Sequence, residues 1–223
     1  MNKKTILSIE NISKIYRNND IHVPALIDVS LTIEEGEFVM ITGRNGSGKS
    51  TLLHQLGLLD MPDKGKIMLN DKEVVSMNES MRTKLRLEYL GYIFQEYALI
   101  AELTALENVM LPAMLIGNSR DARKKAVEIF RKVNLEKKIN RLPSQLSGGE
   151  QQKVAIARSL INDPVIIFAD EPTANLDTTA SVEVLDLFKK INEEGRTIVM
   201  ITHEEEELKY ASRLIKLSDG KLI

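Results

Sequence analysis

The chain has 223 residues, of which 43% are hydrophobic and 28% are charged, and it contains no cysteine. This composition is that of an ordinary globular domain and argues against disordered and fibrous classes. Thirty Lys and Arg against 32 Asp and Glu give a formal net charge of -2, so no overall basic field favours nucleic acid. We therefore expect no disulfide, no nucleic-acid partner and one domain, which can carry a subdomain.

The apolar segments are too short for export or for membrane insertion. After two lysines the N-terminus offers about five largely apolar residues, fewer than the core of a secretory signal requires. The most apolar runs, at 38–42 and 165–169, are also about five residues long, against about 20 for a helix that spans a bilayer. We expect a cytoplasmic protein whose membrane role, if it has one, depends on a partner.

The first half of the chain mixes strands with a helix. Apolar segments separated by polar turns predict strands up to Gly43, and residues 52–59 are predicted to form a buried helix. Asn70 and Asp71 are turn-forming residues between two apolar segments, which predicts a hairpin. The expected strands and hairpin cover residues 6–10, 25–33, 38–42 and 66–75.

The second half is predicted to be helical first and then to return to a sheet. Helical spacing dominates from about 78 to 160. Continuous apolar runs at 165–170 and 197–202 are typical of parallel strands that are covered on both faces. Residues from about 179 to 194 supply the helix that crosses between these two strands. The predicted fold class is α/β.

Residues 43–50, Gly-Arg-Asn-Gly-Ser-Gly-Lys-Ser, match the phosphate-loop pattern GxxxxGK[ST] between a predicted strand and a helix. Glycines let backbone N–H groups surround phosphate oxygens, and the helix N-terminus adds its positive end. Lys49 is expected to reach the outer phosphates, and Ser50 to hold magnesium. A glycine-rich turn that matches by accident is the alternative. The candidate nucleotide-binding residues are Gly43, Arg44, Asn45, Gly46, Ser47, Gly48, Lys49, Ser50 and Thr51.

Two acids follow the apolar run 165–169. Asp170 stands where nucleotide hydrolysis needs a carboxylate that positions the metal ion. Glu171 adds a second carboxylate that can polarise an attacking water, which is the task of a general base. Solvated acids at the end of a strand are the alternative. Their position after a phosphate loop favours the catalytic interpretation.

Residues 146–150, Leu-Ser-Gly-Gly-Glu, resemble the signature motif of the ABC ATPase superfamily and precede Asp170 in the order that this family requires. Ser147, Gly148 and Gly149 at the start of a predicted helix make a second anion site. A helix-capping serine followed by flexible glycines is the alternative. Many relatives have Gln in place of Glu150 and Arg in place of Lys153, which could tune contacts made by this motif.

The resemblance implies a head-to-tail pair of identical chains. ATP bound on the phosphate loop of one copy would be covered by Ser147, Gly148, Gly149 and Glu150 of the other. Segments 36–39 and 103–112 look similar to the lipoprotein-release and macrolide-export subgroup, whose members work with membrane permeases. The resemblance therefore implies ATP and Mg2+ as cofactors. It also implies an integral membrane permease as a partner, and a peripheral location at the inner face of the cell membrane.

Further residues match the family one by one. Tyr16 resembles the aromatic that stacks on adenine, Gln95 the glutamine that touches magnesium near the γ-phosphate, and His203 the histidine that contacts that phosphate. Asp177 closes a loop that resembles the one passing information between subunits, and it is counted among the candidate nucleotide-binding residues. A core or surface aromatic, a solvated glutamine and a structural histidine are the alternatives. The acids 204–207 are interpreted as solvated residues at the start of a helix.

The resemblance implies a P-loop NTPase (RecA-like) parallel-sheet core with an antiparallel β subdomain and an inserted α-helical signature subdomain. Residues 1–94 and 162–223 would form the core with the β subdomain, and residues from about 95 to 161 the helical subdomain. A regulatory ABC ATPase whose membrane partner moves no substrate shares these motifs and stays open. A plain P-loop kinase or GTPase is disfavoured by the signature motif.

Overall fold

The computed structural model describes residues 4–18 and 21–223. Its larger sheet has six strands in the order β10-β9-β3-β8-β7-β6. All neighbouring pairs in it are parallel except β10 with β9. The strands are β3 (Phe38–Thr42), β6 (Leu90–Ile93), β7 (Ile166–Asp170), β8 (Thr197–Ile201), β9 (Arg213–Ser218) and β10 (Lys221–Leu222).

The smaller sheet is antiparallel and has the order β2-β1-β4-β5. Its strands are β1 (Thr5–Asn18), β2 (Ile21–Glu34), β4 (Lys64–Leu69) and β5 (Lys72–Glu73). Asn70 and Asp71 both have positive φ, at 46° and 62°, a backbone region that Asn and Asp tolerate better than most residues. The predicted turn is therefore confirmed, and it closes the β4–β5 hairpin.

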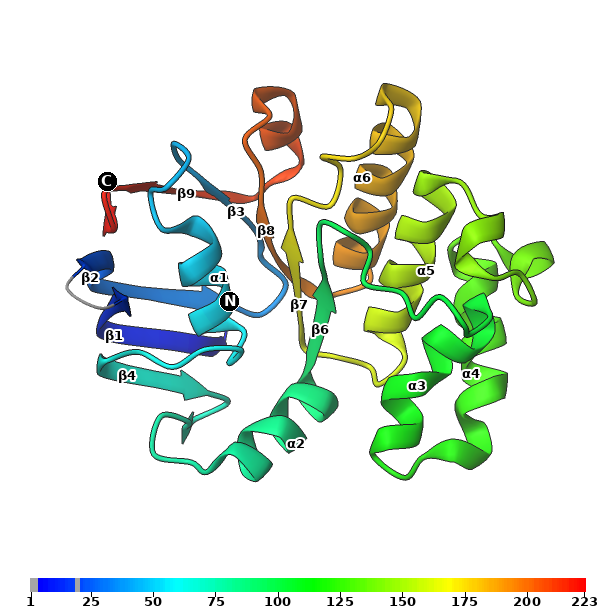
Figure 1. Cartoon of the computed structure of the whole chain (residues 1–223), viewed down its shortest axis with the longest axis horizontal. Helices are drawn as coiled ribbons and strands as arrows, with labels where there is room; N and C mark the ends of the chain where they lie inside the picture. Colours follow the sequence, from blue (N-terminus) through cyan, green and yellow to red (C-terminus); the bar gives the residue numbers. More distant parts are fainter. Residues whose placement is uncertain (1–3, 19–20) are drawn as a thin grey trace.

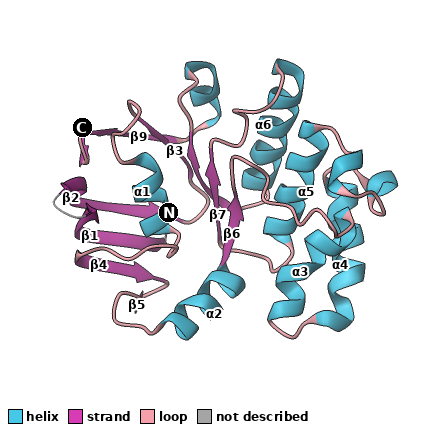
Figure 2. Ribbon diagram, in the orientation of Figure 1, coloured by secondary structure: helices cyan, strands magenta, loops and turns pink. Residues whose placement is uncertain are grey.

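The helices cover both faces of the larger sheet (Figure 1; Figure 2). Helix α1 lies between the two sheets, α6 lies against β8 and β7, and α3, α4 and α5 gather beyond the β6 edge. Their bounds are α1 (Lys49–Leu56), α2 (Glu79–Tyr89), α3 (Ala105–Leu115), α4 (Ser119–Lys132), α5 (Gly148–Leu160) and α6 (Thr178–Glu193), and the short 3-10 helices are η1 (Glu136–Lys138), η2 (Pro143–Gln145) and η3 (Glu205–Tyr210).

Strand β6 is the main feature that the sequence patterns do not predict. Its residues fall inside the segment assigned to helices, yet they pair in parallel with β7, Ile93 opposite Ala169. Four residues are too few for periodicity to separate a strand from a helix. Strands β1 and β2 also extend well beyond the predicted segments, because they pair with each other over almost their whole length.

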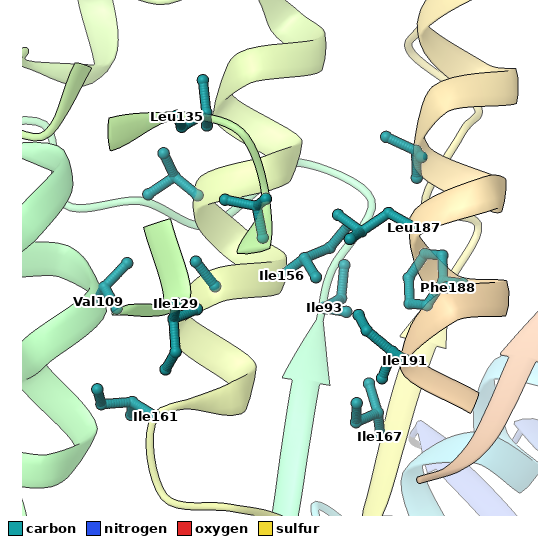
Figure 3. Close-up of a cluster of buried hydrophobic side chains, with 14 of the residues drawn as sticks. Ile93, Val109, Ile129, Leu135, Ile156, Ile161, Ile167, Leu187, Phe188 and Ile191 are labelled. Carbon is teal, nitrogen blue, oxygen red and sulfur yellow. The ribbon is translucent and has the colours of Figure 1, made fainter. Parts of the chain in front are cut away.

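The buried hydrophobic side chains form two clusters in the described part of the chain. Successive residues of β3 alternate between them: Phe38 and Met40 belong to one cluster, Val39 and Ile41 to the other. Strands β7 and β8 alternate between the clusters in the same way, so the prediction that these two strands are covered on both faces is confirmed. The first cluster joins the sheet to α6 and to α3, α4 and α5 (Figure 3), so the helical segment shares its core with the sheet. The division into subdomains stays a prediction.

Phe188 is a large aromatic member of the first cluster. It is fully buried on α6, and its ring packs against that of Phe38 with 6.5 Å between centroids. We expect Phe188→Ala to lower the free energy of unfolding by about 3–5 kcal/mol, because it leaves a large apolar cavity. Urea denaturation measures this, with Val182→Ala on the exposed side of α6 as the matched control. A loss below about 1 kcal/mol would contradict this account of the core.

Candidate functional site

The carboxyl ends of four neighbouring strands bring the predicted site residues to one edge of the larger sheet. Strands β3, β8, β7 and β6 are consecutive and parallel. They end within one residue of a common level, because Ile41 pairs with Ile201, Ile201 with Asp170, and Ala169 with Ile93. The phosphate loop follows β3, His203 follows β8, Glu171 follows β7 and Gln95 follows β6. Ligands of open α/β sheets bind at such an edge.

The phosphate loop depends on glycine at its two ends. Gly43 and Gly48 have φ of 150° and 103°. A Cβ on Gly43 would lie 2.2 Å from the carbonyl oxygen of Leu217, and one on Gly48 would lie 2.3 Å from that of Ala25. Gly46, with φ of 77°, has no heavy atom of the described residues within 4 Å of the place of a Cβ. The two ends of the loop therefore pack against neighbouring backbone, and its tip at Gly46 is unobstructed.

The loop presents a cation and unpaired donors to an anion. Lys49 is only 6% exposed, and its Nζ donates to the carbonyl oxygens of Gly43 and Arg44 at 3.0 and 3.2 Å. The buried Ser47 hydroxyl has no hydrogen-bond partner within the residues described. The first N–H groups of α1 have no acceptor within the helix. These groups fit phosphate oxygens.

Asp170 is a half-buried carboxylate next to the phosphate loop. Burial raises the pKa of its carboxyl above the ordinary value, and the negative charge of Glu171 adds to this effect. His54, the Ser50 hydroxyl and the Lys49 ammonium act in the opposite direction. A hydroxyl and a carboxylate side by side are oxygen ligands that suit Mg2+, so Ser50 and Asp170 fit the predicted metal role.

Glu171 has an unusual backbone. Its φ is 44°, in the left-handed region that residues other than glycine rarely adopt. Its N–H donates to the carbonyl oxygen of Ile201 at 3.2 Å, across the ends of β7 and β8. Its Oε1 lies 3.5 Å from Nδ1 of His203, and Nε2 of His203 lies 3.1 Å from the Glu204 carboxylate. Glu171 and His203, predicted separately, are therefore neighbours.

Glu207 corrects the interpretation of residues 204–207 as solvated acids. Glu204, Glu205 and Glu206 are exposed, but Glu207 is buried with 5% exposure. Its carboxylate accepts hydrogen bonds of 2.6 Å from the hydroxyls of Thr173 and Thr202. The 3-10 helix turns the Glu207 side chain inward. Four consecutive glutamates look alike in the sequence, so the sequence pattern does not show that Glu207 is the buried one.

Gln95 and Tyr16 are two further predicted site residues, and both lie on the surface. Gln95 is exposed, and its backbone carbonyl accepts from the side-chain amide of Asn175 at 3.1 Å. Asn175 thus ties the segment after β6 to the loop after β7. Tyr16 is 45% exposed on β1, and its hydroxyl donates to Asp60 at 3.3 Å. An exposed ring is available for stacking, and the adenine role of Tyr16 stays a prediction.

Ser147 and Glu150 form a reciprocal cap at the start of α5. The Glu150 N–H donates to Ser147 Oγ at 3.3 Å, and the Ser147 N–H donates to the Glu150 carboxylate at 3.0 Å. The Ser147 N–H and the nearby Lys138 ammonium, at 3.0 Å, hold the pKa of Glu150 below its ordinary value. Asp177 likewise caps α6 by accepting from the Ala180 N–H at 2.9 Å. Glu150 and Asp177, both predicted to bind nucleotide, are thus engaged in helix caps.

The signature motif does not join the other site residues within one chain. Figure 1 places the starts of α1 and α5 on opposite sides of β8, β7 and β6. Ser147 is exposed there. Among the hydrogen bonds of the described residues, none links the phosphate loop to residues 146–150. The phosphate loop and the signature motif are therefore two separate candidate anion sites on one chain.

Residues 26–174 match the family model described as ABC transporter. The chain is 48% identical over 219 residues to the lipoprotein-releasing system ATP-binding protein LolD of Aquifex aeolicus, covering 98% of this chain and 96% of that one. It is 45% identical to the macrolide export ATP-binding/permease protein MacB of Chlorobaculum tepidum, covering 98% of this chain and 34% of MacB.

A solved structure resembles this chain over almost the full length of both proteins. It is an ATP-binding cassette in a dimeric, post-hydrolysis state bound to ADP and Pi. The two share 41% identity with a TM-score of 0.89, over 97% of this chain and 96% of that chain. The predicted α/β fold of the P-loop NTPase type and the predicted subgroup are both confirmed.

The raised pKa of Asp170 predicts that this carboxylate destabilises the protein without nucleotide. The folded state binds the proton of Asp170 more tightly than the unfolded state, whose pKa is near 3.8. The loss of stability caused by the Asp170 charge is therefore complete at pH values above the pKa of the folded state. It disappears at pH values below the pKa of the unfolded state. We expect Asp170→Asn to raise the Tm at pH 7, with a gain that shrinks as the pH falls towards 4. Thermal unfolding without nucleotide measures this, and a lower Tm of the variant at pH 7 would contradict it.

Proposed function

The chain belongs to the ABC transporter family as an ATP-hydrolysing subunit, and we propose that two copies of it enclose ATP and drive a membrane permease. The observation that carries this proposal is the separation of two anion sites on one chain. The phosphate loop and the start of α5 each present N–H groups and glycines, yet they face different regions of the fold. A second copy arranged head to tail would bring each phosphate loop against the other signature motif.

Within one copy, the strand edge would hold the phosphates. Lys49 is buried in the loop and already bound to two carbonyl oxygens, so its charge is oriented before nucleotide arrives. Gly43 to Thr51 would surround the phosphates, Tyr16 would stack on adenine, and His203 would contact the γ-phosphate. Magnesium, when bound, neutralises phosphate charge, and Ser50, Asp170 and Gln95 are the residues that would hold it.

The partner copy would complete the site with Ser147, Gly148 and Gly149. The Glu150 carboxylate fixes the Ser147 backbone through the cap, so the motif is rigid before it meets the phosphates. Glu150 and Asp177 would act mainly through the helix starts that they cap. A rigid donor set loses less entropy on binding than a flexible loop does.

Glu171 is the proposed general base. Its carboxylate would accept a proton from water as the water oxygen attacks the γ-phosphorus and the bond to the leaving ADP oxygen breaks. His203, 3.5 Å from Glu171, would orient that carboxylate and sense the γ-phosphate. Loss of the γ-phosphate then removes charge that bridges the two copies, and the pair opens.

The permease is proposed to dock in a hollow of about 340 Å³ between α2, β6 and the end of α3. Leu115, 65% exposed, and Leu59, 42% exposed, line it, and the guanidinium of Arg158 borders it. MacB carries ATP-binding and permease parts in one chain, which supports a permease as the occupant. No helix of the described residues is long and apolar enough to span a bilayer. We propose that the protein is held at the inner face of the membrane by this contact.

Removal of the proposed base should trap the closed pair. We expect Glu171→Gln to lower the ATP hydrolysis rate by about 100-fold or more, since base catalysis is worth about 10²–10⁴-fold. The phosphate ligands remain, so ATP should convert this variant from monomer to dimer. Light scattering with and without ATP and magnesium, together with a phosphate-release assay, measures both effects.

Lys49→Ala is the matched control, because it removes charge that faces the phosphates and should weaken nucleotide binding itself. A Glu171→Gln variant that stays monomeric with ATP and hydrolyses it at the normal rate would exclude the proposed mechanism. Unchanged ATP affinity of Lys49→Ala would count against the role of the phosphate loop.

A charge in the hollow should prevent docking without changing the catalytic edge. We expect Leu115→Asp to reduce retention of the protein on membranes that contain its permease by about 10-fold or more, because a desolvated carboxylate would face an apolar partner. Leu214→Asp is the control, since Leu214 is also exposed but lies on β9 at the other end of the sheet. Equal retention of both variants would rule out this docking site.

A further inference from the structure

The backbone of Glu171 requires support from its surroundings. A left-handed conformation at a residue with a side chain costs about 1–3 kcal/mol and persists only where other contacts fix it. The Glu171 N–H bond to Ile201 is one such contact. A second acts on the next residue, because the buried Gln152 amide of α5 donates to the carbonyl oxygen of Pro172 at 2.6 Å. Neither of these contacts fixes His203.

Glu207 hydrogen-bonds both to the segment that follows β7 and to the segment that follows β8. Thr173 lies two positions after Glu171, and Thr202 directly precedes His203. Their hydroxyls bind different oxygens of the one carboxylate, Thr173 at Oε1 and Thr202 at Oε2, each at 2.6 Å. All three side chains are buried, with exposures of 5–7% for Glu207 and Thr173 and 3% for Thr202.

A backbone contact fixes the direction of the hydrogen bond between Thr202 and Glu207. The Glu204 N–H donates to the Thr202 hydroxyl oxygen at 3.0 Å, so the Thr202 proton points to Glu207. Thr173 Oγ1 donates to the other carboxylate oxygen. A carboxylate accepts from both hydroxyls at once, and hydrogen bonds to a charged acceptor are stronger than neutral ones. An apolar side chain would leave both buried hydroxyls without their acceptor.

We propose that Glu207 is a positioning residue that holds Glu171 and His203 at the distance needed for hydrolysis. It acts through the Thr173 and Thr202 hydroxyls and does not touch the nucleotide. The ends of β7 and β8 are joined by strand pairing only up to Asp170 and Ile201, and the buried carboxylate continues that connection beyond the sheet. This inference rests on the proposed roles of Glu171 and His203 in hydrolysis.

The test compares Glu207→Met, Glu207→Gln and Glu205→Met. Methionine keeps the unbranched shape and fills the space without accepting the hydroxyls. We expect Glu207→Met to lower kcat about 10- to 100-fold, the effect of a small misplacement of a catalytic group. KM and ATP affinity should stay within about 2-fold, because the phosphate loop is untouched. Glutamine keeps one acceptor oxygen and should recover part of kcat.

Glu205→Met is the matched control, since Glu205 lies on the same 3-10 helix and is exposed; its kcat should equal that of the wild type. A folded Glu207→Met protein with normal kcat would overturn the inference. So would a loss in which ATP affinity and Tm fall with kcat while Glu207→Gln is no better, because that pattern indicates a general structural role.

If Glu207→Met does not fold, Thr173→Val and Thr202→Val each remove one hydroxyl with little change of shape. Both should lower kcat while ATP affinity is kept, and normal kcat in both would overturn the inference. Failure of the proposed function is distinguishable: it would appear as an inactive wild type or as a fully active Glu171→Gln. Failure of this inference alone leaves those two results as expected.

Discussion

The level ends of four parallel strands are the constraint on which the rest of the structure depends. Parallel pairing of β3, β8, β7 and β6 forces the residues that follow each strand to one edge of the sheet. The segments that carry Lys49, Glu171 and His203 are separated in the sequence, and strand pairing brings them together. The buried faces of the same strands form two apolar clusters, which fix the spacing of the edge.

This edge combines rigidity with features that cost stability. Asp170 is half-buried with a raised pKa, and Glu171 has a left-handed backbone. Both are unfavourable for an isolated fold and suit a site that receives a charged ligand, since a bound nucleotide and metal would supply the missing interactions. A buried hydrogen bond that Gln152 donates to Pro172 and one that Glu207 accepts from Thr173 hold the segment after β7 in place. The proposed phosphate-binding edge thus contains residues whose conformation or charge is unfavourable without a ligand.

Much of the fold and the site follows from patterns in the sequence. The continuous apolar runs predicted β7 and β8 to within a residue, and the phosphate-loop pattern placed β3 and α1, because these signals come from local geometry. Strand β6 was missed, since four apolar residues do not define a period. Glu207 was missed because burial in a 3-10 helix depends on contacts with Thr173 and Thr202, which no local pattern contains.

The central claim is that each ATP lies between the phosphate loop of one copy and the signature motif of the other. The most direct test mixes two variants, Lys49→Ala and Ser147→Asp, where aspartate keeps the helix cap but repels phosphate. Each alone should be inactive. A mixed pair has one composite site with both Lys49 and Ser147 intact, so the account predicts ATP hydrolysis well above the sum of the separate variants. Hydrolysis no greater than that sum would contradict it.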